Sequence, residues 1–306
     1  MRKRGLLEIE NLILENKDMI FIGSDLGPEV LENVKNRFPD QFYMEGISEA
    51  HVLGMASGLA MDGHRVYVNT IATFFVKRAF EQLAIDICAE NLNVCIYGNG
   101  GGLVYGPLGH THTCLDDFSI LQSLPNLTIL APADENEMAE FVRSSASHNG
   151  PIYIRLGKGG DSIVTAHKKI EIGKANLFGK EAGDVLLIST GVMLQRCLIS
   201  QEALSKENVL TSVLHFSTIK PFDRESLIKH VKKFKSVIVV EEHMRSGGLG
   251  SIISQELFKE KIIPESYFHF HLGDDYIADY GRQEELLDLI GITPKEISAK
   301  ASESIR

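Results

Sequence analysis

Cysteine is scarce in this sequence. The chain has four, Cys88, Cys95, Cys114 and Cys197, and none of them forms a C-x-x-C pair. This spacing excludes zinc ribbons, dithiol redox sites and disulfide-stapled scaffolds. Scattered free cysteines are typical of a reducing compartment, so we expect a cytoplasmic protein.

Long apolar runs and an excess of positive charge are lacking too. No apolar run approaches the roughly 18 residues that a membrane-spanning helix needs. The basic start at Met1–Arg4 is followed by Glu8 and Glu10, which interrupt the apolar core that a signal peptide requires. With 31 basic against 41 acidic residues, the formal charge is −10. Because nucleic-acid backbones are bound by cations, we expect no nucleic-acid partner.

What the chain does have is the composition of a globular protein. Of its 306 residues, 44% are hydrophobic and 24% are charged, and the length predicts about two domains. Short apolar runs alternate with helical segments, which indicates parallel βαβ units. The expected strands are Met19–Ile22, Val66–Asn69, Val94–Tyr97, Leu127–Leu130, Ile152–Ile154, Val185–Ser189, Val209–His215, Ser236–Val240 and Tyr267–Phe270. The expected helices are Pro28–Arg37, Glu49–Met61, Phe75–Glu90, Glu135–Ser147, Met193–Ser205, Arg224–Lys232, Leu249–Phe258 and Glu284–Ile290.

The sequence therefore predicts an α/β fold of two domains, each a mostly parallel β-sheet flanked by helices. The first domain covers residues 1–165 and the second covers residues 183–306. Residues 166–182 are polar and rich in lysine, and we interpret them as a linker with room for a short hairpin.

The segment Glu45–His51 combines a turn glycine with a carboxylate at a helix start. Gly46 suits a tight turn, Ser48 is placed to cap the helix that begins at Glu49, and small apolar residues follow. A carboxylate in a first helical turn is stabilised by the helix dipole, whatever its function. The apolar helix behind it nevertheless makes Glu49 a candidate for chemistry.

Phe75, Arg78 and Gln82 fall on one face of the next predicted helix, at positions i, i+3 and i+7. Aromatic residues on a helix usually belong to the core. The two polar residues on the same face weaken that interpretation and suggest a binding surface.

A glycine-rich segment, Gly100–His112, follows the predicted strand that ends at Tyr97. Loops at the carboxyl ends of strands are where α/β sheets bind ligands. His110 and His112 lack a third ligand at metal-binding spacing, so acid–base work or substrate contact fits them better, and we predict no metal site on this chain. A second glycine-rich segment, Glu241–Ser251, has no phosphate-loop fingerprint, and we predict a structural or interface role for it.

In this order the motifs resemble the C-terminal half of transketolase-type, thiamine-diphosphate-dependent enzymes. Gly46–Glu49 matches the Gly-Ile-x-Glu signature of the family's pyrimidine-binding domain. Phe75–Gln82 matches its aromatic–Arg–Ala–aromatic–acid–Gln run, most closely that of deoxyxylulose-phosphate synthases. Each motif alone is modest, but the ordered set is specific and spans nearly the whole chain. Three further segments resemble later stretches of the family's sequence: Leu130–Glu137, Thr218–Asp223 and Glu241–Ser251.

The resemblance implies roles for these residues. Glu49 hydrogen-bonds N1′ of the aminopyrimidine of thiamine diphosphate and thereby promotes removal of the proton from thiazolium C2. Phe75 stacks on the aminopyrimidine, with Arg78 and Gln82 beside it. His112 faces the substrate end of the cofactor, where it can hydrogen-bond a carbonyl oxygen or move a proton. His110 has no counterpart in the family and is the weaker candidate for substrate contact.

The Gly-Asp-Gly motif and later Asn with which the family holds the diphosphate and a divalent metal are missing from this chain. The resemblance therefore implies one half of a split enzyme that transfers a two-carbon ketol unit between sugars or sugar-like carbonyl compounds. A separate N-terminal subunit would carry the diphosphate and Mg²⁺ or another divalent metal. The cofactor would lie between the two chains, and we expect a heterotetramer with two copies of each.

The chain departs from the family where the substrate is expected. Leu108 stands where typical transketolases have an Asp that reads a sugar hydroxyl, and Glu29 stands where they have a serine near the phosphate. Lys158 stands where the family often has an Arg, and it can bind an anion only as a point charge. These departures predict an atypical substrate, either modified near the aldehyde or lacking the usual terminal phosphate.

Three alternatives stay open. The β subunit of a 2-oxo acid dehydrogenase shares this layout, although Phe75–Gln82 and Gly109–His112 favour a transketolase. A condensation with pyruvate, as in deoxyxylulose-phosphate synthases, is not excluded. A non-catalytic subunit of the same fold is the third alternative, and the intact Glu49 argues against it.

Overall fold

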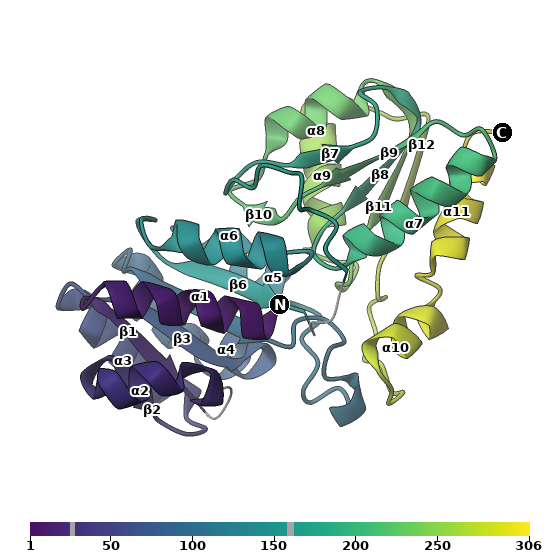
Figure 1. The fold of residues 1–306 in the computed structure, drawn as a ribbon. Helices are drawn as coiled ribbons and strands as arrows, with labels where there is room; N and C mark the ends of the chain where they lie inside the picture. Colours follow the sequence, from purple (N-terminus) through teal and green to yellow (C-terminus); the bar gives the residue numbers. More distant parts are fainter. Residues whose placement is uncertain (25–27, 158–161) are drawn as a thin grey trace.

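The structure is a computed structural model that describes residues 1–24, 28–157 and 162–306. It contains two sheets with helices packed on both faces, one in each half of the chain (Figure 1). The predicted α/β fold with two mostly parallel sheets is therefore confirmed. Within the described residues, no helix combines the length and the apolar character needed to span a membrane.

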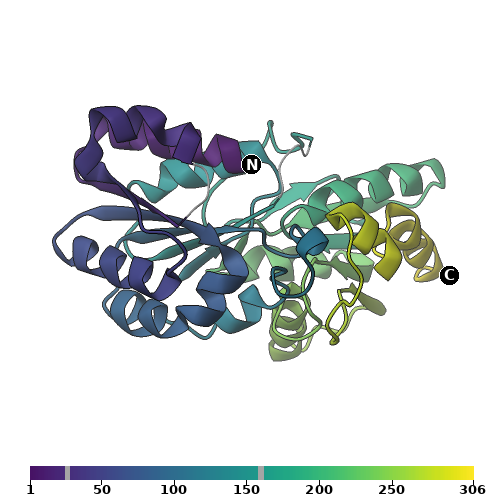
Figure 2. The ribbon, with the colours of Figure 1, turned by 90° about the horizontal axis from the view of Figure 1, so that it is seen from below.

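The first sheet has the strand order β10-β5-β6-β4-β3-β1-β2, and all its neighbours are parallel except β10 and β5. Its inner strands β1, β4 and β6 are buried along their whole length, because helices cover both faces. Figure 2 shows the purple helices near the N-terminus on one face and blue helices on the other. Its strands are β1 (Met19–Gly23), β2 (Phe42–Met44), β3 (Arg65–Ile71), β4 (Val94–Asn99), β5 (Thr128–Leu130), β6 (Ile152–Leu156) and β10 (Thr218–Lys220).

The first half of the chain contains α-helices, 3-10 helices and a π-helix. The α-helices are α1 (Arg2–Glu15), α2 (Glu32–Arg37), α3 (Glu49–Met61), α4 (Ala72–Arg78), α5 (Asp117–Leu121) and α6 (Glu135–Ser145). The 3-10 helices are η1 (Pro28–Leu31), η2 (Pro39–Gln41) and η4 (Gly106–Leu108), and the π-helix is η3 (Gln82–Ala89). The single helix predicted over Phe75–Glu90 is thus wrong, because the chain leaves helical geometry at Ala79 and resumes as a π-helix.

The second sheet has the order β12-β11-β8-β9-β7, with only the β7–β9 pair antiparallel. Its strands are β7 (Asn176–Phe178), β8 (Gly183–Ser189), β9 (Thr211–His215), β11 (Phe234–Val240) and β12 (Ser266–Phe270). Its helices are α7 (Met193–Lys206), α8 (Arg224–Val231), α9 (Leu249–Lys259), α10 (Gln283–Ile290) and α11 (Pro294–Glu303).

The two halves of the chain are interlocked rather than joined by a free linker. Part of the predicted linker, β7, pairs with β9 in the second sheet and forms no hairpin of its own. In the other direction, β10 of the second half adds an antiparallel edge strand to the first sheet. A single apolar cluster also contains Leu127 and Ala131 from the first half together with Ile188 and Phe216 from the second. The position of each half is therefore fixed by the other.

Candidate active site

Glu49 is the first residue of α3 and follows a tight turn. Gly46 has a φ of 72°, a left-handed conformation that glycine adopts without strain. Ser48 does not cap the helix as predicted, because its hydroxyl donates to the carbonyl oxygen of Glu45, 3.2 Å away. The Glu49 side chain is only 5% exposed. The turn thus places a buried carboxylate at the positive end of a helix dipole.

Arg78, at the end of α4, connects Glu49 to an aromatic ring. Its guanidinium lies 3.5 Å from the Glu49 carboxylate and 4.1 Å from the centre of the Phe74 ring. The His112 ring packs edge-on against the same Phe74 ring, with the centroids 5.1 Å apart. One aromatic side chain therefore lies between the predicted cofactor residue Arg78 and the predicted substrate residue His112.

Phe74, and not Phe75, is the aromatic residue on this surface. Phe75 is fully buried, and its ring stacks on Tyr153 with the centroids 5.7 Å apart. A ring without exposed surface in the single chain has no face to offer a ligand. In this conformation Phe75 has a core position, which is the usual place of an aromatic residue on a helix, and its stacking on the cofactor stays a prediction.

The histidine loop, residues 100–112, is pinned at its base and open at its tip. Gly102 and Cys114 exchange backbone hydrogen bonds of 2.8 and 3.0 Å. Beyond them, Nδ1 of His112 lies 2.9 Å from the Thr111 hydroxyl, and the exposed His110 ring lies 5.9 Å from that of Tyr276. Both predicted histidines are thus held near Phe74 by the same loop.

These elements surround a pocket of about 720 Å³. It is built from α4, the histidine loop and a segment of the C-terminal domain. The lining residues are Thr73, Phe74, Lys77, Arg78, His110, Thr111, Tyr276, Ile277 and Ala278. Glu49 and His112 lie behind this lining, each in contact with one of its members.

Three more predicted site residues, Gln82, Leu108 and Glu29, are not brought to this pocket. Gln82 begins the π-helix, so the i, i+7 spacing from Phe75 no longer places the two residues on one face. Leu108 is 52% exposed on η4, and Glu29 is exposed on η1, both outside the lining. Lys158 lies outside the described residues.

The second glycine-rich segment has the structural role predicted for it. The Glu241 carboxylate accepts hydrogen bonds from the backbone of Leu249 (2.7 Å) and Gly250 (2.8 Å), at the start of α9. His269 adds a third contact of 2.8 Å. Burial alone would raise the pKa of Glu241, but the hydrogen bond from His269 and the nearby imidazoles hold it below its ordinary value.

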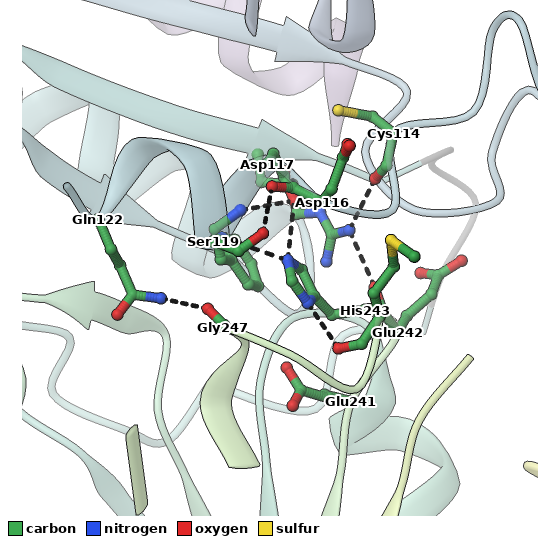
Figure 3. A network of polar contacts seen from close by, with 12 residues as sticks. Cys114, Asp116, Asp117, Ser119, Gln122, Glu241, Glu242, His243 and Gly247 are labelled. Atoms are coloured by element: carbon green, nitrogen blue, oxygen red, sulfur yellow. Dashed lines mark hydrogen bonds and ion pairs between the residues drawn. The ribbon is translucent and has the colours of Figure 1, made fainter. Parts of the chain in front are cut away.

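Glu242 follows in the same segment, beside the polar network of Figure 3, and its side chain contacts the first domain. Its carboxylate accepts from the backbone of Leu103 at 2.8 Å and from the Gln283 side chain at 2.9 and 2.8 Å. A glycine at position 102 provides the space for this carboxylate, because a Cβ there would lie 2.4 Å from the Glu242 carboxyl carbon. Burial raises the pKa of Glu242, while neighbouring Arg155 opposes that shift. Glu242 therefore fixes the base of the histidine loop.

Arg155, in the first domain, makes further contacts where the two domains meet beside Glu242. Its guanidinium donates to the backbone carbonyls of Cys114 (3.2 Å) and Glu242 (2.9 Å) and lies 3.1 Å from the Asp117 carboxylate. Asp117 also accepts from the Tyr153 hydroxyl at 2.8 Å. This buried network joins the core beneath α4 to the loop that carries the histidines.

Sequence reasoning missed Tyr276, Ile277 and Ala278, and no motif in the sequence signalled them. It also passed over two buried asparagines, Asn69 and Asn99, at the carboxyl ends of β3 and β4. The Asn99 amide donates to the Asn69 side chain and to the Thr70 carbonyl. A polar residue that ends an otherwise apolar run was the available signal for them.

Comparison with known proteins agrees with this arrangement. The transketolase pyrimidine binding domain matches residues 1–160, and the transketolase C-terminal domain matches residues 173–297. A transketolase family protein of Sinorhizobium fredii is 33% identical over 87% of this chain and 77% of its own length. One subunit of the apulose-4-phosphate transketolase of Phocaeicola vulgatus is 31% identical over 90% of each chain. The 1-deoxy-D-xylulose-5-phosphate synthase of Alkaliphilus oremlandii is 32% identical over 87% of this chain, but only 42% of that protein is covered.

Solved structures show the same likeness. A split gene transketolase, described as an inactive β4 tetramer, has a TM-score of 0.87 at 28% identity and covers 99% of this chain and 97% of its own. The transketolase of Campylobacter jejuni shares the fold, with a TM-score of 0.75 at 18% identity over 98% of this chain and 46% of its own. The chain belongs to the transketolase family and comprises the pyrimidine-binding and C-terminal domains of that family.

Proposed function

We propose that this chain is the C-terminal subunit of a split transketolase-type enzyme that uses thiamine diphosphate to transfer a two-carbon ketol unit between sugars or sugar-like carbonyl compounds. The observation that carries the proposal is the buried Glu49 carboxylate beside Arg78, at the edge of a pocket lined by the half-buried Phe74 ring. The similarity to one subunit of a transketolase supports a second, N-terminal chain as partner. The cysteine usage supports a cytoplasmic location.

The residues present fit the pyrimidine end of the cofactor. Glu49 offers a buried carboxylate to a ring nitrogen, and Phe74 offers a ring surface at the pocket. When bound, thiamine diphosphate supplies the nucleophilic carbon for the transfer. The diphosphate and its divalent metal would be held mainly by the partner chain, whose motif for them this sequence lacks.

Each residue of this chain then has a defined task. Glu49 would hydrogen-bond the ring nitrogen of the cofactor through its carboxylate, and Arg78, 3.5 Å away, orients that carboxylate. His112 hydrogen-bonds the substrate carbonyl oxygen or moves a proton to it, with its ring fixed by Phe74 and Thr111. His110, on the pocket wall, contacts substrate.

The test is co-expression with the N-terminal subunit, followed by a screen of ketose donors with thiamine diphosphate and Mg²⁺. We expect turnover from the complex and none from the purified single chain. Glu49→Gln in the complex should lose about 10²–10⁴-fold in activity, the usual range for an acid–base contribution. Assembly and melting temperature should persist, since a first-turn carboxylate stabilises a helix by only about 0.3–1 kcal/mol.

Glu32→Gln is the matched control, because Glu32 is an exposed carboxylate in the first turn of α2. It should keep full activity. A Glu49→Gln complex that turns over normally would remove Glu49 from the mechanism, and turnover by the single chain would refute the split enzyme.

The departures at Leu108 and Glu29 support an atypical substrate. With xylulose 5-phosphate and ribose 5-phosphate we therefore expect kcat/KM below the range of an efficient enzyme, about 10⁴ M⁻¹s⁻¹. A higher value would indicate an ordinary transketolase.

A second candidate reaction is condensation with pyruvate. It is favoured by the similarity to 1-deoxy-D-xylulose-5-phosphate synthases. Release of CO₂ from pyruvate by the complex in the presence of an aldehyde, with no turnover of ketose donors, would select it over ketol transfer. Reduction of a lipoyl-bearing acyltransferase would instead select the 2-oxo acid dehydrogenase.

A further inference from the structure

The C-terminal domain contributes a wall to the pocket of the first domain. Tyr276, Ile277 and Ala278 lie between β12 and α10, in the segment 274–281, and all three line the pocket. Tyr276 is 78% exposed, although its ring is only 5.9 Å from that of His110. A large ring left in water beside a pocket gains favourable burial when a ligand covers it.

The segment is held at its N-terminal end by the junction around Glu242. The Arg245 amide donates to the Gly273 carbonyl at 3.0 Å, and the Arg245 guanidinium lies 3.2 Å from Asp274. The Leu272 amide donates to the His243 carbonyl at 2.9 Å. These contacts fix the point from which the chain crosses the pocket.

The C-terminal end of the segment packs closely against the histidine loop. A Cβ at Gly109 would lie 2.6 Å from the Tyr280 ring, and one at Gly106 would lie 2.6 Å from the Gly281 carbonyl oxygen. Figures 1 and 2 both show α10 beside this loop. With both ends fixed, Tyr276 is held at the pocket without filling it.

The charged residues that line the pocket are cationic. Lys77 and Arg78 are among the nine described lining residues, and none of the nine is acidic. Arg78 faces Glu49, and Lys77 lies 3.2 Å from Asp116. The Lys77 ammonium has three donors, so donors remain for a bound anion. Asp275 and Asp279 flank Tyr276 but are exposed and outside the lining.

We propose, on the basis of the function proposed above, that Tyr276 is a specificity-determining residue for a small anionic substrate. Its ring lies along the carbon chain of the substrate, and Lys77 binds the phosphate or carboxylate at the end of that chain. The C-terminal domain would thus take part in substrate selection together with Lys77 of the first domain, which also holds the cofactor residues.

The chain has no tryptophan, which makes a direct binding test possible. Tyr276→Trp introduces a single indole at the pocket, and Phe258→Trp introduces one at an 87% exposed position on α9 as the control. The full chain, without cofactor or partner, is titrated with glycerol 3-phosphate, D-glycerate, neutral glycerol and inorganic phosphate. Indole emission is the readout.

We expect a saturable change in Tyr276→Trp emission with glycerol 3-phosphate or glycerate, and none in Phe258→Trp. Saturation by either anion supports the proposal. The anion that binds more tightly shows whether Lys77 binds a phosphate or a carboxylate. Adding Lys77→Gln should weaken binding about tenfold or more, as expected for a hydrogen bond to a charged group. Glycerol binding as tightly as the anions, inorganic phosphate binding as tightly as glycerol 3-phosphate, or no saturable change would each overturn the proposal.

A kinetic arm then applies to the complex. Tyr276→Ala should raise the KM for the anionic substrate and leave kcat within about twofold, since the ring contacts only bound substrate. A loss of kcat with unchanged KM would contradict this role. The titration needs no turnover, so it can succeed even if the proposed ketol transfer fails.

Discussion

Two adjacent phenylalanines have opposite surroundings, and this leads to a prediction for each. Phe75→Ala removes a ring that is fully buried against Tyr153, so it should destabilise the chain by about 3–5 kcal/mol, the usual cost of such a truncation in a core. Phe74→Ala removes a ring at the pocket surface, so it should leave stability nearly unchanged and weaken binding of thiamine diphosphate to the complex.

Urea unfolding of the single chain and calorimetric titration of the complex measure the two effects separately. Phe75→Leu serves as the conservative control, because it keeps most of the buried volume. A stable Phe75→Ala chain whose complex binds cofactor weakly would restore the stacking role to Phe75.

At this scale family motifs mark Glu49, Arg78 and His112, and the glycine-rich loop marks His110. In the structure Arg78 and His110 line one pocket, and Glu49 and His112 contact its lining. Phe75, the predicted stacking residue, is buried in the core, and its stacking on the cofactor stays a prediction. Helical periodicity depends on an unbroken helix, and the interruption at Ala79 separates Gln82 from the face that carries Phe75 and Arg78.

At the scale of elements, Glu242 connects the C-terminal domain to the histidine loop. Glu242→Ala would leave the Leu103 amide and the Gln283 side chain without an acceptor, and each buried unpaired donor costs about 1–3 kcal/mol. We expect lower stability and faster amide exchange over residues 100–112. Glu202→Gln, an exposed carboxylate on α7, is the control. Unchanged exchange in this loop would show that Glu242 does not fix it.

A hydrogen bond that depends on pH lies just before the segment that carries Tyr276. Nδ1 of His271 accepts from the Gly273 amide at 2.9 Å, which requires that nitrogen to be unprotonated. Burial, together with neighbouring His269 and Arg245, lowers the pKa of His271, while Asp274 and Glu241 oppose the shift. In the unfolded chain the pKa returns to about 6.5. The contribution of His271 to stability is therefore complete above about pH 6.5 and is lost as the pH falls below that value.

Melting temperatures between pH 7.5 and 5.5 check this expectation. The wild-type chain should lose stability on acidification, and His271→Gln should lose less of it. His167→Gln, at an exposed position, should follow the wild-type profile. Identical profiles for all three chains would remove His271 from the pH response.

The longer helices and strands were predictable from the sequence. The three-residue strands and the contacts between residues far apart in the sequence were not. Most parallel strands and helices matched the apolar pattern, and Asp134 caps α6 as an Asp at that position should. The strands β2 and β10, of three residues each, are too short to show a period. The approach of Tyr276 to His110 joins residues far apart in the sequence, so it follows only from the packing of both domains.

At the scale of the whole molecule, the first domain leaves large apolar side chains exposed. Met61 on α3 and Ile85 on η3 are 58% and 61% exposed, and a Cβ at Gly58 of α3 would meet only open space. The structurally similar split gene transketolase is itself described as an inactive β4 tetramer. We therefore predict that the isolated chain is larger than its 33.9 kDa monomer in solution.

Ile85→Glu tests this assembly, because a charge placed in an apolar contact costs far more than one in water. Light scattering should show the wild-type chain as an oligomer and Ile85→Glu as a smaller species, with Phe258→Glu, at an even more exposed apolar position on α9, unchanged. The same contact between copies would make the complex with the N-terminal subunit a heterotetramer with two copies of each chain. If Ile85→Glu leaves both assemblies intact, the copies meet through another surface, whereas a fully active one-to-one complex of the wild-type chain would show that no contact between copies is needed.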